Sequence, residues 1–184
     1  VLYDTQMAAK GLHFPRVSLV GVVNADSMLY MDDFRAGERT FSLLTQLVGR
    51  AGRAGKRGRA VIQTFNPDNE ILRKAALQDY VTFYESEIAL RRAVLFPPFC
   101  DIAVLALSGP DEFALLEFAT LLGEESRKLE SAAPPDARVI RLGPFRQAVY
   151  KLNGKYRQRI VYKYKDNKAS RAFLSELLVR SLKL

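Results

Sequence analysis

The sequence predicts an α/β unit built on a parallel sheet, followed by a small α+β domain of β-α-β-β-α order. Residues 17–23 (VSLVGVV) form a continuous apolar run that suits a strand buried on both faces of a parallel sheet. A helical pattern separates this run from a second short strand at residues 60–64. Asn153-Gly154 indicates the second domain, because this dipeptide between two long strand patterns is a strong hairpin signal.

Composition indicates a globular protein with enough apolar side chains for a core. The chain has 184 residues, of which 48% are hydrophobic and 26% charged, enough for one domain or two small ones. It shows neither an apolar run of membrane-spanning length nor a signal peptide, so we expect a cytoplasmic protein without membrane contact. One cysteine, Cys100, and one histidine, His13, cannot form a disulfide or a tetrahedral metal site within the chain, so we expect it to bind no zinc.

The net charge of +8 suggests a polyanionic partner, and the distribution of charge is more informative than its sum. Residues 138–165 contain nine basic residues and no acidic one, whereas residues 68–130 are acidic on balance. The nine are Arg138, Arg141, Arg146, Lys151, Lys155, Arg157, Arg159, Lys163 and Lys165. A second basic stretch, residues 50–59, lies in the first half of the chain.

The first part of the chain begins with a short predicted helix at residues 6–10. Thr5 is its N-cap and Gly11 ends it. A helix N-terminus with a hydroxyl at its cap can hold a phosphate. From these residues alone, a plain capped helix is an equally good interpretation.

Three further helices are predicted, at residues 34–49, 71–77 and 79–93. The last of them ends before Phe96-Pro97-Pro98-Phe99, because proline restricts the residue before it and cannot continue a helix. We interpret its aromatic residues, which lie beside three acids, as core and linker packing and not as a base-stacking set: Tyr80, Phe83 and Tyr84.

The second domain is predicted to run as a strand at residues 101–108, a helix at 111–130, two strands at 139–152 and 156–165, and a final helix at 168–183. Acidic residues in the first turn of the long helix and basic residues in its last turn match the helix dipole at both ends. The layout is that of a small α+β domain with helices over one face of a sheet.

The segment Gln46–Arg53 (QLVGRAGR) places two arginines three residues apart at the predicted end of a helix, with Gly49 and Gly52 beside them. A guanidinium stays protonated and offers forked donors to phosphate oxygens, so Arg50 and Arg53 could stabilise charge on a transferring phosphoryl group. An ordinary helix end followed by a solvated basic turn is the alternative, with about even weight on composition alone.

The predicted hairpin carries the other candidate site, a basic two-stranded ribbon. Its cations could hold phosphates, and its tyrosines could stack an unpaired base. A solvated sheet face and a docking surface for an acidic peptide are the alternatives. The candidate DNA-binding residues are Arg146, Lys151, Lys155, Tyr156, Arg157 and Arg159.

Several segments resemble one helicase family. QLVGRAGR closely resembles motif VI of superfamily 2 helicases, Q-x-x-G-R-x-G-R. Residues 5–26 (TQMAAKGLHFPRVSLVGVVNAD) look like motif V of the primosomal protein N′ (PriA) family of replication-restart helicases, except that His13 stands where the family usually has aspartate. Residues 33–46 and 143–163 are also similar to that family. We therefore identify the chain as a C-terminal fragment of a member.

This resemblance implies the domain organisation. Residues 1–75 would be the C-terminal part of a second RecA-like helicase lobe, residues 76–97 a helical linker, and residues 98–184 the C-terminal α+β domain. The phosphate-binding loop G-x-x-x-x-G-K-[ST] does not occur in this sequence. We therefore expect ATPase activity of the full-length protein and none of this chain alone.

The resemblance also implies the function. The full-length protein would be an ATP-dependent 3′–5′ DNA helicase that recognises stalled forks and restarts replication by primosome assembly. Its partners would be single-stranded and forked DNA, single-stranded DNA-binding protein and other primosome proteins. ATP and Mg²⁺ would be bound mainly by the absent first lobe. The alternative is a non-enzymatic nucleic-acid-binding or protein-docking module.

Site residues follow from the matched motifs. Arg53 would be the arginine finger and Arg50 its catalytic companion. The residues that couple the nucleotide to DNA would be Gln46, Gly49, Gly52 and Gly11. Motif V would add the DNA contacts Thr5, Gln6 and Lys10 to those of the basic ribbon.

Overall fold

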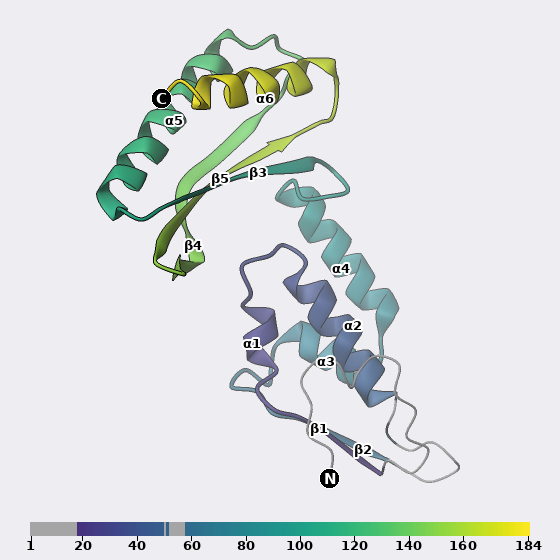
Figure 1. Cartoon of the computed structure of the whole chain (residues 1–184). Helices are drawn as coiled ribbons and strands as arrows, with labels where there is room; N and C mark the ends of the chain where they lie inside the picture. The colour runs from purple at the N-terminus through teal and green to yellow at the C-terminus, as the bar shows by residue number, and fades with distance from the viewer. Residues whose placement is uncertain (1–17, 50, 52–57) are drawn as a thin grey trace. The chain divides into compact units, whose positions relative to one another are not determined.

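The computed structural model describes residues 18–49, 51 and 58–184 of the chain (Figure 1). These residues belong to two compact units, Val1–Ala89 and Leu90–Leu184, which we describe separately. The division lies within the helix α4 (Tyr80–Ala93). The domain boundaries predicted after residues 75 and 97 remain predictions.

The first unit combines a small sheet with helices. β1 (Leu19–Val22) pairs in parallel with β2 (Arg59–Ile62). The helices are α1 (Asp26–Leu29), α2 (Ala36–Val48), α3 (Glu70–Leu77) and the first part of α4. The helices predicted at 34–49, 71–77 and 79–93 are therefore present, with ends that differ by no more than two residues.

The core of the first unit lies between α2, α3 and α4. Phe41 of α2 stacks on Phe83 of α4, with ring centroids 4.0 Å apart and an interplanar angle of 5°. Leu44 and Leu72 are buried beside them. This confirms that Phe83 is a core residue, and the spacing of Phe41 and Leu44 explains why one face of α2 packs inward.

The predicted fold class, a partial RecA-like lobe followed by an α+β domain, is wrong. The described residues form a two-stranded parallel sheet and a separate three-stranded antiparallel sheet. Leu19 is 61% exposed and Val61 50% exposed, so β1 and β2 are not buried on both faces. Of the side chains of β1 and β2, only Val22 and Ile62, at the strand ends, pack against the core. The apolar pattern indicates a strand, and the strand is present. Burial on both faces also needs neighbouring layers of structure, and the described residues do not provide them.

The second unit is a three-stranded antiparallel sheet with helices on one face (Figure 1). Its strands, in spatial order, are β3 (Asp101–Gly109), β5 (Lys155–Tyr164) and β4 (Ile140–Leu152). The helices are α5 (Glu112–Ala132) and α6 (Lys168–Ser181). This part follows the expected β-α-β-β-α order. The core joins Ile160 and Tyr162 of β5 to side chains of both helices.

Local signals set the turn and the helix starts in this unit. Asn153 and Gly154 have φ angles of 50° and 77°, the left-handed region that a two-residue hairpin turn requires. Asp111 caps α5 by accepting a hydrogen bond from the Ala114 amide at 2.8 Å. Asn167 and Ser170 form a capping box at the start of α6.

One polar group in the second core is buried without a partner. Tyr162 is fully buried, and its ring meets Phe173 edge-on, with centroids 6.1 Å apart. Its hydroxyl has no hydrogen-bond partner among the described residues, and nearby Ser126 donates its own hydroxyl to Glu130 at 2.9 Å. Burial raises the pKa of Tyr162 above its usual value.

Candidate nucleic-acid interface

Most predicted residues of the helicase motifs lie outside the described residues. These are Thr5, Gln6, Lys10, Gly11, His13, Arg50, Gly52 and Arg53. Their roles therefore stay predictions.

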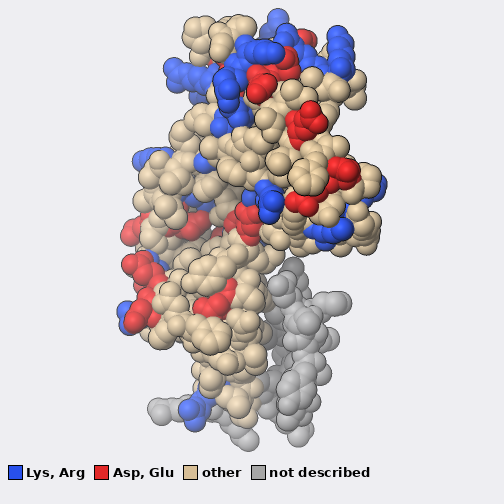
Figure 2. Space-filling model, turned by 90° about the vertical axis from the view of Figure 1, so that its left-hand side faces the viewer, with Lys and Arg blue, Asp and Glu red and all other residues tan. Residues whose placement is uncertain are grey.

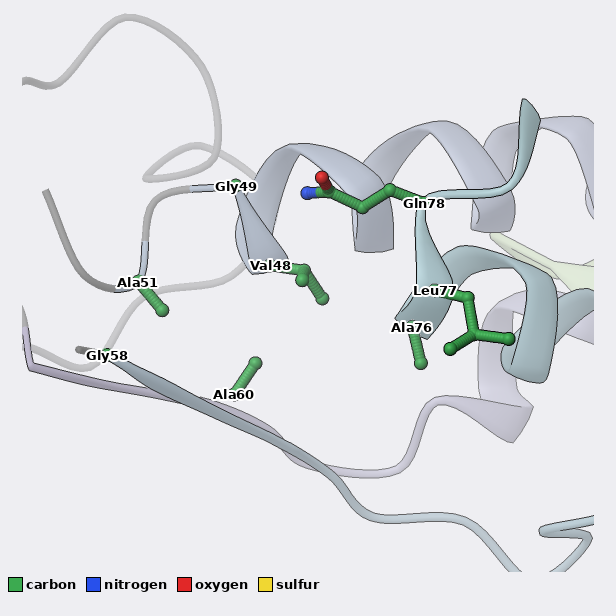
Figure 3. Close-up of a pocket in the computed structure, with 8 residues that line it drawn as sticks. All are labelled: Val48, Gly49, Ala51, Gly58, Ala60, Ala76, Leu77 and Gln78. Carbon is green, nitrogen blue, oxygen red and sulfur yellow. The ribbon is translucent and has the colours of Figure 1, made fainter.

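Gln46 and Gly49 lie at the C-terminal end of α2, as the sequence predicts. Gly49 caps the helix, and its amide donates to the Thr45 carbonyl at 3.0 Å. The side chain of Gln78, which follows α3, reaches the same carbonyl at 3.5 Å (Figure 3). Sequence analysis missed Gln78, since nothing in the pattern marks a glutamine that reaches a neighbouring helix.

A hollow of about 450 Å³ opens at this end of α2 (Figure 3). Small side chains make most of its wall, and the Gln78 amide extends across it toward Gly49. The lining residues are Val48, Gly49, Ala51, Gly58, Ala60, Ala76, Leu77 and Gln78. Two of its lining residues, Gly49 and Ala51, belong to the predicted nucleotide site segment QLVGRAGR, whose arginines lie outside the described residues.

The basic ribbon, β4 and β5, is present, but its predicted DNA-binding residues do not share one surface. Successive side chains of a strand point to opposite faces of the sheet. Even positions of β5 face α5 and α6, because Ile160 and Tyr162 lie in the core with these helices. Odd positions of β5 face the other side of the sheet, which we name the open face: Arg157, Arg159, Val161 and Lys163.

Three of the predicted residues gather near the hairpin turn on the helix side of the sheet. We name their group the tip cluster: Glu112, Arg146, Tyr150, Lys151 and Tyr156. The Arg146 guanidinium lies 4.4 Å from the centre of the Tyr150 ring, and the two tyrosine rings meet edge-on at 5.5 Å. Lys151 Nζ lies 4.4 Å from the centre of the Tyr156 ring and donates to its hydroxyl at 3.1 Å.

Glu112, in the first turn of α5, supplies the carboxylate of the tip cluster. Its Oε1 accepts a hydrogen bond from the Tyr150 hydroxyl at 2.8 Å and lies 3.4 Å from Arg146 Nη2. The hydrogen bond to Glu112 raises the pKa of Tyr150 above its usual value, and desolvation adds to the rise. From sequence, Glu112 looks like a residue that complements the helix dipole, and no signal connects it with the hairpin.

The open face combines cations with exposed apolar side chains. Arg157 and Arg159 lie on its central strand, and Lys155 precedes them at the turn. Phe145, opposite Arg159 on β4, is 48% exposed, and Val104 on β3 is 52% exposed. The open face therefore places two half-buried guanidinium groups on the same side of the sheet as exposed apolar side chains.

Besides Arg146 and Lys151 of the tip cluster, Lys163 and Arg141 also make internal contacts. Lys163 is only 9% exposed, because its Nζ donates to the Val94 carbonyl at 2.7 Å and lies 3.9 Å from the centre of the Phe96 ring. Arg141 Nε donates to Glu130 Oε1 at 3.0 Å. A sequence count of basic residues therefore overestimates the charge available to a ligand.

Acidic side chains from α5 also enter the basic surface. Glu112 and Glu130 reach cations of β4, although residues 138–165 contain no acidic residue. Figure 2 shows Lys and Arg side chains over the second unit, with Asp and Glu lying among them. The field around the ribbon is positive but less one-sided than the local sequence predicts.

Two further properties concern metals and membranes. Among the described residues, no group of three or more His, Cys, Asp or Glu side chains is placed to hold a metal ion. None of the described helices combines the length and apolar character needed to cross a membrane.

Comparison with known proteins confirms the resemblance. A model of the primosomal protein N C-terminal domain matches residues 92–183. The replication restart protein PriA of Bacillus subtilis (strain 168) is 38% identical over 178 residues, which are 97% of this chain and 22% of that protein. The PriA of Rickettsia prowazekii (strain Madrid E) is 42% identical over 161 residues, which are 88% of this chain and 24% of that protein.

A third relative, the PriA of Chlamydia muridarum (strain MoPn / Nigg), is 50% identical over 99 residues, which are 54% of this chain and 13% of that protein. The chain thus spans at most about a quarter of the length of these relatives. The family model covers half of the chain. The chain therefore belongs to the primosomal protein N (PriA) family and carries its C-terminal domain.

Proposed function

We propose that this chain is the C-terminal part of an ATP-dependent 3′–5′ DNA helicase that recognises stalled replication forks and restarts replication by primosome assembly. The observation that carries the proposal is family membership together with QLVGRAGR at the end of α2. The relatives are named replication restart proteins, which supports a role in restart. The protein would act in the cytoplasm with other primosome proteins.

In the full-length protein, ATP with Mg²⁺ is the substrate, held mainly by parts outside this chain. Arg53 stabilises charge on the transferring phosphoryl group, assisted by Arg50, while Gln46 and the neighbouring glycines couple the nucleotide to DNA. Arg53→Ala is expected to lower ATP turnover by about a thousandfold or more and to leave DNA binding intact. Near-normal ATP turnover of the purified full-length variant would contradict this role.

The nucleic-acid part of the proposal rests on the cations that β4 and β5 carry. Single-stranded and forked DNA would bind through phosphate contacts, so affinity should fall as salt rises. We would titrate the chain against a labelled single strand by fluorescence anisotropy at several salt concentrations. Reversal of two open-face cations, Arg157→Glu with Arg159→Glu, should weaken binding. It should also reduce the slope of log affinity against log salt concentration by about 1.4, at about 0.7 per lost phosphate contact.

The matched control is Lys168→Glu with Lys183→Glu. Both lysines are exposed, Lys168 at the first residue of α6 and Lys183 two residues after its last, and this variant changes the net charge of the chain by the same amount. It should retain most of the affinity if phosphate contacts are localised on the ribbon. Equal losses in the two variants would show that net charge alone attracts DNA, and the ribbon assignment would then fail.

Peptide docking is a second candidate function, favoured by the composition of the open face. Arg157 and Arg159 lie beside the exposed side chains of Val104 and Phe145, which suits an acidic segment with apolar residues. The tail of single-stranded DNA-binding protein is the ligand to test. If reversal of Arg157 and Arg159 abolished peptide binding and spared DNA binding, the open face would be a protein-docking surface.

A further inference from the structure

The tip cluster contains an anion of its own, and that anion occupies the groups that a phosphate would use. Glu112 Oε1 lies 3.4 Å from Arg146 Nη2 and accepts a hydrogen bond from the Tyr150 hydroxyl at 2.8 Å. We infer that Glu112 is an internal competitor for nucleic-acid phosphate at Arg146 and thereby limits the affinity of the tip cluster for nucleic acid. The inference rests on the proposed nucleic-acid-binding function.

A phosphate can replace this carboxylate because the two groups present similar acceptors to a guanidinium. The Arg146 side chain is 66% exposed and that of Glu112 35% exposed, so a ligand can reach the pair from solvent. The contact is a single long one, and exposed ion pairs of this kind are weak. Displacement of Glu112 therefore costs less free energy than the phosphate contact that replaces it contributes.

The other members of the tip cluster stay in place when the carboxylate leaves. Arg146 lies over the Tyr150 ring, which in turn meets Tyr156 edge-on, and Lys151 lies over the Tyr156 ring. The rings hold both cations and leave the Tyr150 hydroxyl as a further donor. The Arg146 guanidinium and this hydroxyl then point at the position that the carboxylate occupies in the free protein.

Glu112 is not needed to cap α5. Asp111 performs that task, since its Oδ1 accepts from the Ala114 amide at 2.8 Å. The described contacts of the Glu112 carboxylate are made with β4, which is far from it in sequence. A role in controlling Arg146 therefore accounts for contacts that helix capping does not explain.

The test is Glu112→Gln in the 184-residue chain. Glutamine keeps an acceptor for the Tyr150 hydroxyl and removes the charge that holds Arg146. Anisotropy titration against a labelled single strand should show affinity higher by about threefold to tenfold at low salt, with a salt slope steeper by about 0.7, the value for one added phosphate contact. Glu117→Gln, at an exposed position of the same helix, removes the same charge and should change affinity less than twofold.

A second pair of variants isolates the mechanism. In an Arg146→Ala background, Glu112→Gln should leave both affinity and salt slope unchanged, because the cation for which Glu112 and phosphate compete has been removed. If Glu112→Gln weakens binding, matches Glu117→Gln, or acts equally in the Arg146→Ala background, the inference is overturned while the proposed function stands. If neither the unaltered chain nor Glu112→Gln binds the strand, the proposed function itself fails, and the inference fails with it.

Discussion

Lys163 provides the sharpest test of the distinction between ribbon cations that make internal contacts and those that a ligand can reach. Its Nζ donates to the Val94 carbonyl at 2.7 Å and lies 3.9 Å from the centre of the Phe96 ring. The side chain thus attaches the segment after α4 to the middle strand of the second sheet. Lys163→Met keeps most of the apolar stem but removes the charge and the donor.

The expected cost follows from these two contacts. A hydrogen bond from a charged donor contributes about 1.5–3 kcal/mol, and a cation over an aromatic ring contributes about 0.5–2 kcal/mol. Because one ammonium group makes both contacts, they do not add fully, and we expect Lys163→Met to lose about 2–3 kcal/mol. For a unit of this size, that loss lowers the melting temperature by roughly 10–20 °C.

Thermal unfolding followed by circular dichroism measures the loss, and hydrogen exchange of the β5 amides places it in the second unit. Lys165→Met is the matched control, because Lys165 lies two residues further along the chain and is exposed. It should change stability by less than about 0.5 kcal/mol. DNA affinity should fall no more for Lys163→Met than for the control. Equal stability of the two variants would refute the internal role of Lys163.

Three further outcomes are expected. Tyr162→Phe should cost nothing or stabilise the fold in urea titration, because the buried hydroxyl has no partner among the described residues; a loss of about 1 kcal/mol would show that it is hydrogen-bonded. The pKa of Asp26 lies below its usual 3.8, chiefly because its carboxylate accepts a hydrogen bond from the Phe65 amide. The ionised carboxylate therefore stabilises the fold above pH 3.8, and this stabilisation is lost as pH falls below that value. Asp26→Asn should make the melting temperature depend less on pH between pH 5 and 3. Phe83→Ala removes the ring stacked on Phe41 and should cost about 3–5 kcal/mol in the same urea titration, against less than about 0.5 kcal/mol for an exposed helix position.

Local elements of the fold were predictable because short-range signals encode them. Asn153-Gly154 requires a left-handed turn, and the observed φ angles of 50° and 77° place the hairpin there. Phe41 and Leu44 follow helical spacing, and both are buried in α2. The larger architecture was not predictable in the same way. Residues 17–23 have the composition of a central strand, but strand composition does not determine how many strands and layers surround it.

The candidate interface shows the same division. The sequence predicted the two strands of the basic ribbon, and its six candidate residues stay predictions that rest on a local excess of cations. It could not show that strand alternation places Arg157 and Arg159 on one face and Tyr156 on the other. That partition depends on which residues of β5 face the helices, and only the packed core decides it.

The sequence alone was sufficient for the family, for the helices α2 to α6 and for the hairpin, since each follows from short patterns of residue type. Only the tertiary structure decided which charges a ligand can reach. It pairs Glu112 with Arg146 across 34 positions of the chain and places Lys163 against Val94 across 69. Such contacts have no local signal, because they form only when segments far apart in the sequence pack together.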